Sequence, residues 1–462
     1  MSHDLPPIIA NWFAERGWAP RQHQLDVLES WQRGASQLLI APTGAGKTLA
    51  GFLPTLVDLV DGDFEGLHTL YISPLKALAV DVQRNLSTPI DEMGLPIRVE
   101  ARTGDTSAAK RQRQRSRPPH VLMTTPEQLA LLISHPKAEL MFGTLKRVVL
   151  DELHALVTSK RGDLLALGLA RLAKHAPEMR VTALSATIAR PEMLRDWIAQ
   201  PHKERPTDLL HMVGGAPPEL GILETEERLP WAGHSARYAH HELMDIIREH
   251  KTTLLFVNTR SQAEMLFQGL WDINEEMMPI ALHHGSLSVD QRRKVEAAMA
   301  DGRLKAVVCT STLDLGIDWG DVDLVVQVGA PKGSSRMLQR IGRANHRLDD
   351  PSKALLVPSN RFEVLECEAA VEAVAEGQQD SEDPQPGGYD VLAQHVLGMA
   401  CSEAFIADDL YHEVIRAWPY KDLPRAQFDR ILDFVATGGY ALRAYERYAR
   451  LRQTDDAKWR IA

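Results

Sequence analysis

The sequence predicts an α/β protein in which two parallel-sheet domains follow one another and a small helical module comes last. Short β-rich runs alternate with longer amphipathic stretches in two consecutive series, and the pattern then changes to helical periodicity. Strands that alternate with helices build parallel sheets that are covered on both faces. The chain has 462 residues, 44% of them hydrophobic and 25% charged, which is enough for about three folded domains.

The first series of runs lies within residues 1–200, the predicted first domain. The run Gln37–Ala41 precedes a glycine-rich turn and a helical pattern that begins near Lys47. Further runs of the same kind are His68–Ile72, Val121–Thr124, Val148–Leu150 and Val181–Leu184. An amphipathic stretch follows each run, so we expect these runs to form one parallel sheet.

The second series lies within residues 201–376, the predicted second domain. Residues 200–233 contain many prolines and glycines, which predict a domain boundary with extended segments that pack on the following sheet. The expected strands are Thr253–Val257, Ile280–His283, Ala306–Cys309, Leu324–Val328 and Ala354–Val357. Helical stretches separate them, so the second domain is expected to be of the same class as the first.

The last part of the chain follows a polar segment, Gly377–Gly388, which we interpret as a solvated linker. Residues 389–462 then show helical periodicity and form the predicted third module. No capping or stop signal ends this module, as is expected where a natural chain is longer. Its basic residues Arg443, Arg447, Arg450 and Arg452 have helical spacing, which predicts one basic helix face or a plain packing surface.

The overall composition excludes some classes of protein without identifying a ligand. Lys and Arg number 52 and Asp and Glu 62, and the resulting net charge of −10 neither indicates nor excludes nucleic-acid binding. No apolar run reaches the roughly 20 residues that cross a bilayer, and the first residues lack the pattern of a signal peptide. Three cysteines far apart in the sequence indicate a reducing cytoplasm.

The strongest local motif is the glycine-rich loop Ala41–Thr48, between the first expected strand and its helix. Backbone N–H groups of such a loop point at phosphate oxygens, and the helix N-terminus adds positive potential. The Lys47 ammonium can reach the β and γ phosphates, and the Thr48 hydroxyl can ligate Mg²⁺. The alternative is a chance glycine-rich turn. The expected nucleotide-binding residues of the loop are Thr43, Gly44, Ala45, Gly46, Lys47 and Thr48.

Two carboxylates, Asp151 and Glu152, follow the apolar run Val148–Leu150. A carboxylate at a strand end beside a phosphate loop is expected to anchor Mg²⁺, so the predicted metal ligands are Thr48 and Asp151. Glu152 is expected to polarise the attacking water. The alternative is an acidic helix N-cap, which the phosphate loop upstream argues against.

A basic segment in the second domain, Gln339–His346, completes the predicted catalytic set. Its arginines, Arg340 and Arg343, can reach across a cleft and neutralise the charge that develops on the transferred phosphoryl group. An ordinary basic surface helix is the alternative interpretation. A second basic segment, residues 98–117, contains seven Lys or Arg against two acids and predicts either a track for nucleic acid or a solvated helix face.

Taken in order, these segments resemble the motifs of superfamily 2 helicases, more closely the large helicase-related (Lhr) branch and bacterial ligase-associated DNA-damage-response DEXH-box proteins. Trp18–Gln24 is similar to the adenine-reading Q motif, Ala41–Thr48 to motif I, and Asp151–His154 to a motif II of the DExH type. Segments similar to motifs Ia, Ib, Ic, III, IV, IVa, V and VI are Ser73–Leu78, Thr103–Asp105, Thr124–Glu127, Ser185–Thr187, Phe256–Arg260, His284–Ser286, Ser311–Asp318 and Gln339–His346.

One departure concerns His346, which stands where many superfamily 2 proteins carry a second arginine. Arg343 is then the main candidate for the arginine finger, and Arg340 is the second. Leu153 and His154 distinguish the chain from DEAD-box RNA helicases, which have alanine and aspartate at these two positions.

The resemblance implies two RecA-like domains, a winged-helix-like module, and an ATP-dependent DNA translocase and helicase that moves 3′ to 5′ in DNA repair, with ATP and Mg²⁺ as cofactors. The implied catalytic residues are Lys47, Asp151, Glu152, Gln339, Arg340 and Arg343. Nucleotide binding adds Arg21, Gln24, Gly316 and Asp318. The implied nucleic-acid contacts are Pro74, Lys76, Thr103, Thr125, Pro126, Arg260, Ser286, Thr310 and Ser311.

The expected ligands are single-stranded DNA and tailed duplexes, and the expected partners are a DNA ligase and a nuclease, with a monomeric protein and no membrane. Two other functions stay open from the motifs: unwinding of RNA or of an RNA–DNA hybrid, and an ATP-switched clamp that holds nucleic acid without unwinding it. A GTPase would need a guanine-reading Asn-Lys-x-Asp after the loop, and a small-molecule kinase would need a substrate lid. The sequence shows neither feature.

Overall fold

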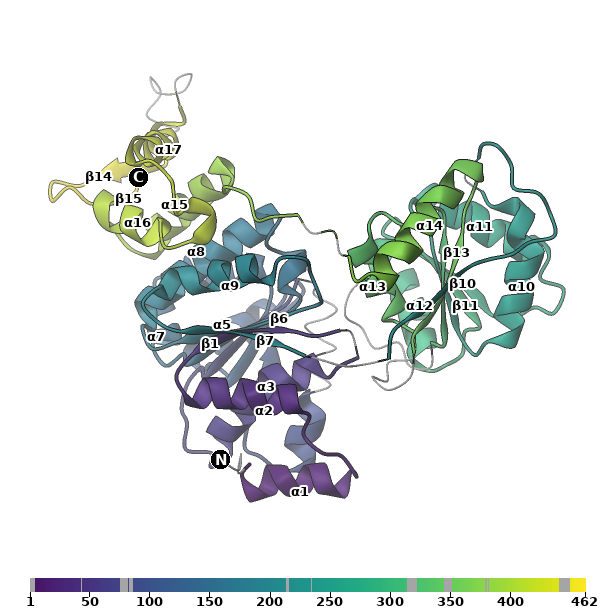
Figure 1. Cartoon of the computed structure of the whole chain (residues 1–462). Coiled ribbons are helices and arrows are strands. Elements are labelled where there is room, and N and C mark those ends of the chain that lie inside the picture. The colour runs from purple at the N-terminus through teal and green to yellow at the C-terminus, as the bar shows by residue number, and fades with distance from the viewer. Residues whose placement is uncertain are drawn as a thin grey trace.

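The computed structural model contains two α/β domains and a small C-terminal module, as predicted (Figure 1). It describes residues 5–42, 44–74, 82, 86–212, 216–233, 235–313, 322–344, 351–378, 380, 382–439 and 449–462. The C-terminal module lies against the first domain, and the second domain stands to one side of both. Among the described helices, none is both long and apolar enough to cross a membrane.

The described part of the first domain is built on a seven-stranded sheet of order β3-β4-β2-β5-β6-β1-β7, in which all neighbouring strands are parallel. Its strands are β1 (Ser36–Ile40), β2 (Thr69–Ile72), β3 (Val99–Ala101), β4 (Val121–Thr124), β5 (Arg147–Leu150), β6 (Arg180–Ser185) and β7 (Thr207–His211). Successive side chains of a strand alternate between the two faces. Leu70 and Ile72 therefore pack in one hydrophobic cluster, and Tyr71 packs in the other.

Helices cover both faces of this sheet, as the two clusters require. They are α1 (Pro7–Glu15), α2 (Gln22–Gln32), α3 (Lys47–Leu59), α5 (Ala108–Ser116), α6 (Pro126–Ile133), α7 (Ala138–Phe142), α8 (Lys160–His175) and α9 (Pro191–Ala199). Helix α3 starts directly after Gly46, whose φ of 75° lies in the left-handed region that glycine adopts without strain. Prolines at the first positions of α6 and α9 favour helix starts there because the missing N–H has no helical acceptor.

Strand β7 lies outside the runs that the sequence predicts, and it belongs to the first sheet. Its Leu210 is paired with Leu39 of β1, so the first sheet extends past the predicted boundary at residue 200. The next strand, β8 (Glu219–Ile222), pairs with the second sheet. Both are half-exposed edge strands without a continuous apolar run. The expectation that extended segments between residues 200 and 233 pack on the second sheet is confirmed for β8 and wrong for β7.

In the second domain, the described residues form a parallel sheet of order β10-β11-β9-β12-β13-β8. The predicted runs become β9 (Thr253–Phe256), β10 (Ile280–His283), β11 (Ala306–Cys309), β12 (Leu324–Val328) and β13 (Lys353–Val357). The helices are α10 (His240–Glu249), α11 (Arg260–Asp272), α12 (Val289–Ala300), α13 (Ser334–Ile341) and α14 (Arg361–Ala375). Capping boxes at Thr259 and Ser288 set the starts of α11 and α12.

The C-terminal module combines three helices with a hairpin in the part of it that the structure describes. The helices are α15 (Tyr389–Ser402), α16 (Ala407–Val414) and α17 (Arg425–Thr437), and the antiparallel strands are β14 (Leu451–Gln453) and β15 (Trp459–Ile461). The predicted basic helix face is wrong for Arg450 and Arg452, because Arg450 precedes β14 and Arg452 belongs to it. Burial of Leu451 on a short strand explains the difference. Arg443 and Arg447 lie outside the described residues.

The C-terminal module and the first domain share one hydrophobic core. A single cluster contains Leu165 of α8 together with Leu392, Met399 and Phe428 of the module. A buried ion network crosses the same contact, since the Arg171 guanidinium of α8 donates to Glu413 at 2.9 Å and also to Glu403. The module is therefore expected to move with the first domain as one body.

Replacing Arg171 by alanine is expected to lower the stability of this contact by about 3–5 kcal/mol, because Glu413 would stay buried without its cation. Lys174→Ala is the matched control, since Lys174 is 53% exposed and lies 3.5 Å from Glu403, and an exposed pair contributes at most about 1 kcal/mol. Urea unfolding monitored by tryptophan fluorescence measures both variants. Equal, small losses would show that the network does not stabilise the contact.

Candidate active site and nucleic-acid interface

The predicted catalytic residues of the first domain meet at the carboxyl edge of its sheet. Strands β5, β6 and β1 are neighbours, so the segments that follow them lie side by side. Asp151 follows β5, Ser185 ends β6, and the glycine-rich loop follows β1. Ligands of open parallel sheets bind at this edge.

The Lys47 side chain is held inside the glycine-rich loop. Its ammonium donates hydrogen bonds to the carbonyl oxygens of Ala41 at 2.8 Å and Pro42 at 3.2 Å. Burial lowers the pKa of Lys47, while the nearby charges of Glu152 and Asp151 raise it. Gly44 and Gly46 have φ values of 80° and 75°, which turn the loop around the start of α3. Thr43 lies outside the described residues.

The Asp151 carboxylate is buried and its two oxygens have fixed partners. Oδ1 accepts from the Glu152 backbone N–H at 3.0 Å, and Oδ2 accepts from the Tyr71 hydroxyl at 2.8 Å. Burial, and then the negative charge of Glu152, raise the pKa of Asp151 to about 7. A divalent cation at this carboxylate would offset that penalty, and the hydroxyl of Thr48 and the carboxylate of Asp151 are the oxygen ligands that Mg²⁺ prefers. The residues present therefore fit a magnesium ion.

Glu152 has a strained backbone, with a φ of 48° in the left-handed region. Such a conformation costs about 1–3 kcal/mol in a residue other than glycine and is common in active sites. Burial raises the pKa of Glu152, but the positive charges of Lys47 and Arg343 outweigh it and hold the pKa below its usual value. Glu152 is thus a carboxylate at neutral pH, as a proton acceptor must be.

His154 links the carboxylate pair to the end of β6. Its Nδ1 accepts from the Ala186 backbone N–H at 3.2 Å and lies 3.1 Å from Ser185 Oγ. Burial lowers the pKa of His154, so the ring is neutral at neutral pH. Because Nδ1 is the acceptor, the proton lies on Nε2, which is 3.4 Å from a Glu152 oxygen. The sequence identifies both segments but not this connection between them.

The structure places the two candidate finger arginines in different surroundings. The Arg340 guanidinium lies 4.8 Å from the centre of the Phe256 ring and donates to Gln327, inside the second domain. Arg343 follows α13 and is 3% exposed, and its charge lowers the pKa of both Lys47 and Glu152 in the first domain. Of the two, Arg343 is therefore the one whose charge acts across the cleft.

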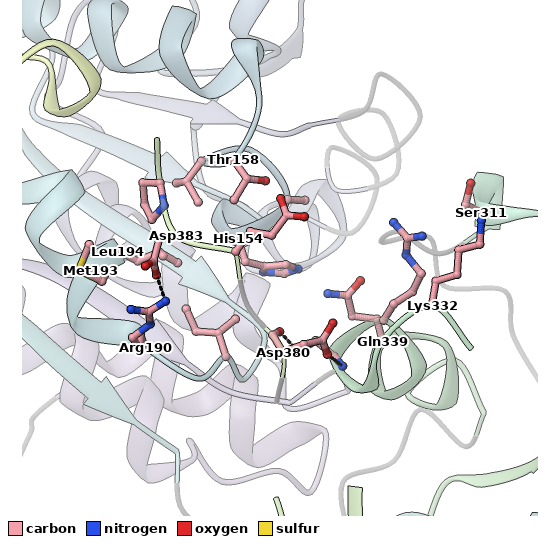
Figure 2. Close-up of a pocket in the computed structure, with 17 residues that line it drawn as sticks. His154, Thr158, Arg190, Met193, Leu194, Ser311, Lys332, Gln339, Asp380 and Asp383 are labelled. Atoms are coloured by element: carbon pink, nitrogen blue, oxygen red, sulfur yellow. Dashed lines mark hydrogen bonds and ion pairs between the residues drawn. The ribbon is translucent and has the colours of Figure 1, made fainter. Parts of the chain in front are cut away.

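A cavity of about 580 Å³ opens between the two domains beside this site. His154 and Gln339 lie on opposite walls of it, and Ser311 and Lys332 line it from the second domain (Figure 2). Ser311, predicted as a nucleic-acid contact, thus faces the cleft between the domains.

Described residues of the predicted solvated linker, among them Asp380 and Asp383, line this cavity. Asp380 accepts hydrogen bonds from the Ser335 backbone N–H at 2.7 Å and the Ser334 hydroxyl at 2.8 Å, at the start of α13. Asp383 forms an ion pair with Arg190 of the first domain (Figure 2). The prediction of a purely solvated linker is wrong for these residues, because a helix N-terminus and an arginine attract their carboxylates.

A second cavity, of about 690 Å³, lies beside the glycine-rich loop. Gln24 and Arg21 line it, as expected for the nucleotide-binding residues, and the Gln24 side chain accepts from the Arg21 backbone N–H at 2.9 Å. The sequence does not predict Arg16, whose guanidinium lies 5.0 Å from the centre of the Trp18 ring. Trp18 is 53% exposed and can pack against a flat base.

The expected nucleic-acid contacts follow the carboxyl ends of the strands in both domains. In the first domain these residues are Pro74, Thr103, Thr125 and Pro126. In the second domain the Arg260 guanidinium donates to the Ser286 hydroxyl at 2.7 Å, and Thr310 follows β11. Lys76, Gly316, Asp318 and His346 lie outside the described residues.

Part of the basic segment 98–117 stabilises the turn at Thr103. The buried Arg102 guanidinium donates to the Arg111 carbonyl at 3.1 Å, and Arg111 donates to the carbonyls of Thr103 and Gly104. Arg113 pairs with Glu100 at 2.6 Å. These arginines therefore have structural contacts in addition to any role in binding phosphate.

Comparison with known proteins gives matches along most of the chain. Residues 21–194 match the DEAD/DEAH box helicases, residues 239–347 the helicase conserved C-terminal domain, and residues 372–462 the winged helix domain of the large helicase-related protein. The ATP-dependent helicase Lhr-Core of Methanocaldococcus jannaschii is 34% identical over 447 residues, covering 93% of this chain and 52% of that protein. The Lhr helicase/uracil glycosylase of Escherichia coli is 34% identical, covering 93% of this chain and 32% of that protein.

A solved structure of Mycobacterium smegmatis helicase Lhr bound to ssDNA and AMP-PNP is 35% identical, with a TM-score of 0.87, and covers 99% of this chain and 60% of that chain. The chain spans about half the length of the archaeal relative. Together with the two tandem sheets, these matches confirm the expected RecA-like domains and winged-helix module. The chain belongs to the large helicase-related (Lhr) family of superfamily 2 helicases.

Proposed function

We propose that the chain is an ATP-hydrolysing motor that moves 3′ to 5′ along single-stranded DNA, unwinds duplexes and acts in DNA repair. The observation that carries this proposal is the cavity between the two domains, where His154 of the first domain lies opposite Gln339 of the second, with the buried Arg343 just after α13. One triphosphate between these residues would connect the two domains, and its hydrolysis would release them.

In the proposed mechanism, the backbone of the glycine-rich loop and Lys47 bind the phosphates of ATP. Thr48 and Asp151 would hold Mg²⁺, which would neutralise charge on the phosphate oxygens when bound. Glu152 accepts a proton from the attacking water. Arg343 stabilises the negative charge that develops on the transferred phosphoryl group.

The base of the nucleotide would occupy the cavity beside the loop, where Gln24 and Arg21 lie. Gly316 and Asp318 are nucleotide-binding residues only by the resemblance, since they lie outside the described residues. A change in the charge or position of Glu152 would affect Ser185 through His154, which lies beside both residues. Gln339 faces His154 across the cleft. Because the cleft lies between the domains, loss of the γ phosphate would change their separation.

Hydroxyl groups and positively charged side chains lie at the carboxyl edges of both sheets. Such groups bind the phosphates of a single nucleic-acid strand and do not read its base sequence. The M. smegmatis relative was solved with ssDNA, which supports DNA as the ligand. The 3′ to 5′ polarity, the role in repair, the association with a DNA ligase and a nuclease, a cytoplasmic location and a monomeric state rest on the resemblance to ligase-associated helicases.

ATP turnover with single-stranded DNA or RNA of one sequence, and strand displacement on duplexes with a 3′ or a 5′ tail, test this function. We expect stronger stimulation by DNA and displacement of the 3′-tailed duplex only. Equal stimulation by RNA would contradict the DNA preference, and displacement of the 5′-tailed duplex would contradict the polarity. Turnover without displacement would identify a clamp in place of a helicase.

A further inference from the structure

Tyr71 is a polar side chain in an otherwise apolar part of the first sheet. It lies in the middle of β2, paired in register with Val149 of β5 and Met123 of β4, and its side chain is fully buried. Burying a hydroxyl without a partner costs about 1–3 kcal/mol in proteins. A phenylalanine would fill the same space without this cost. The contacts of the hydroxyl must therefore offset the free energy that its burial costs.

The Tyr71 hydroxyl lies beside the two proposed magnesium ligands, Asp151 and Thr48. The hydroxyl donates to Asp151 Oδ2 at 2.8 Å. Burial raises the pKa of Tyr71 well above its usual value, and the nearby Thr48 side chain offsets part of that rise. Thr48 lies in the first turn of α3 and Asp151 follows β5, so Tyr71 lies beside two segments that are far apart in the sequence.

These contacts determine the orientation of the Asp151 carboxylate. One of its oxygens is held by the Glu152 backbone N–H and the other by Tyr71, so the carboxylate plane has little freedom to turn. Hydrogen-bond donors behind a metal ligand orient it and adjust its basicity, and removing one commonly lowers metal affinity by about 10–100-fold.

We propose that Tyr71 is a positioning residue for the magnesium site, whose hydroxyl holds the Asp151 carboxylate in the geometry that binds Mg²⁺ together with Thr48 and the nucleotide. The proposal rests on the assignment of Thr48 and Asp151 as metal ligands. Tyr71 itself does not touch the nucleotide in this scheme and acts only through Asp151.

The test measures how much Mg²⁺ strengthens nucleotide binding. A fluorescent ATP analogue is titrated onto the full chain with excess Mg²⁺ and again with EDTA, and the ratio of the two dissociation constants gives the contribution of the metal. We expect Tyr71→Phe to reduce this ratio by about 10–100-fold, with little change in the affinity measured in EDTA. A role in packing alone would lower both affinities together or neither.

Tyr420→Phe is the matched control, because Tyr420 is also buried and its hydroxyl donates to the Gly388 carbonyl at 2.8 Å, far from the nucleotide. Its ratio is expected to equal that of the unmodified chain. Asp151→Asn tests the metal site separately. A reduced ratio in Asp151→Asn with an unchanged ratio in Tyr71→Phe would overturn the inference alone, whereas an unchanged ratio in Asp151→Asn would overturn the magnesium site.

If Tyr71→Phe does not fold, the inference is tested on the unmodified chain instead. The eight tyrosines are labelled as 3-fluorotyrosine and observed by ¹⁹F NMR. With nucleotide present, added Mn²⁺ should broaden one resonance strongly, and Mg²⁺ should shift that same resonance. Absence of a resonance that responds to both ions would show that no tyrosine hydroxyl contacts the metal ligands.

Discussion

Arg343→Ala is expected to lower the ATP turnover number by a factor of about 10³ or more while leaving ATP affinity in the same range. The arginine would meet charge that develops only in the transition state, so its loss affects the chemical step more than binding. The buried position of Arg343, and the effect of its charge on Lys47 and Glu152, support this expectation. Steady-state turnover with saturating single-stranded DNA measures the effect.

Arg336→Ala is the control for this variant, because Arg336 lies on α13, the helix that Arg343 follows, and lines the cleft cavity. It should keep turnover within a few-fold of the unmodified chain. Arg340→Ala should instead lower the stability of the second domain, since Arg340 contacts Phe256 and Gln327. A mild loss of turnover in Arg343→Ala, with a normal melting temperature, would contradict its assignment as the finger.

Glu152→Gln is expected to retain ATP and to lower its hydrolysis by a factor of about 10²–10⁴. The amide keeps the size of the side chain and loses the negative charge that accepts a proton. Lys47, Thr48 and Asp151 remain, so the nucleotide still binds and holds the two domains together. The variant should therefore form a long-lived complex with single-stranded DNA in the presence of ATP.

Single-turnover hydrolysis and the dissociation rate of labelled DNA measure these two effects. Glu127→Gln is the control, because Glu127 is a carboxylate of the same domain that pairs with Arg161 instead of facing the loop. It should hydrolyse ATP normally. Hydrolysis at the normal rate in Glu152→Gln would show that another group accepts the proton from the attacking water.

Local sequence patterns predict most strands of the two sheets. They also predict the part of the site that belongs to the first domain. The runs that became β4, β10, β11 and β12 are predicted with their observed bounds. Strands β4, β11 and β12 are fully buried, and fully buried parallel strands are continuous apolar segments. The loop before Lys47 is predicted because glycines at tight turns and a following helix are local features.

Arg340 and Arg343 show what a local pattern leaves open. They are three residues apart in one basic segment, and both are candidates from the sequence. Arg340 packs on Phe256 inside the second domain, whereas the charge of Arg343 lowers the pKa of Glu152 in the first domain. This difference depends on how α13 and the turn after it pack in the folded protein.

The order of the motifs, the strand–loop–helix unit around Lys47 and the alternation of two series of strands follow from the amino-acid sequence, because each depends on neighbouring residues and their periodicity. The sheet to which β7 belongs, the docking of Asp380 and Asp383, the core shared by the C-terminal module and the first domain, and the bond from Tyr71 to Asp151 were decided by tertiary structure. Each joins segments tens to hundreds of residues apart, whose pairing depends on packing and charge in space and leaves no periodic trace along the chain.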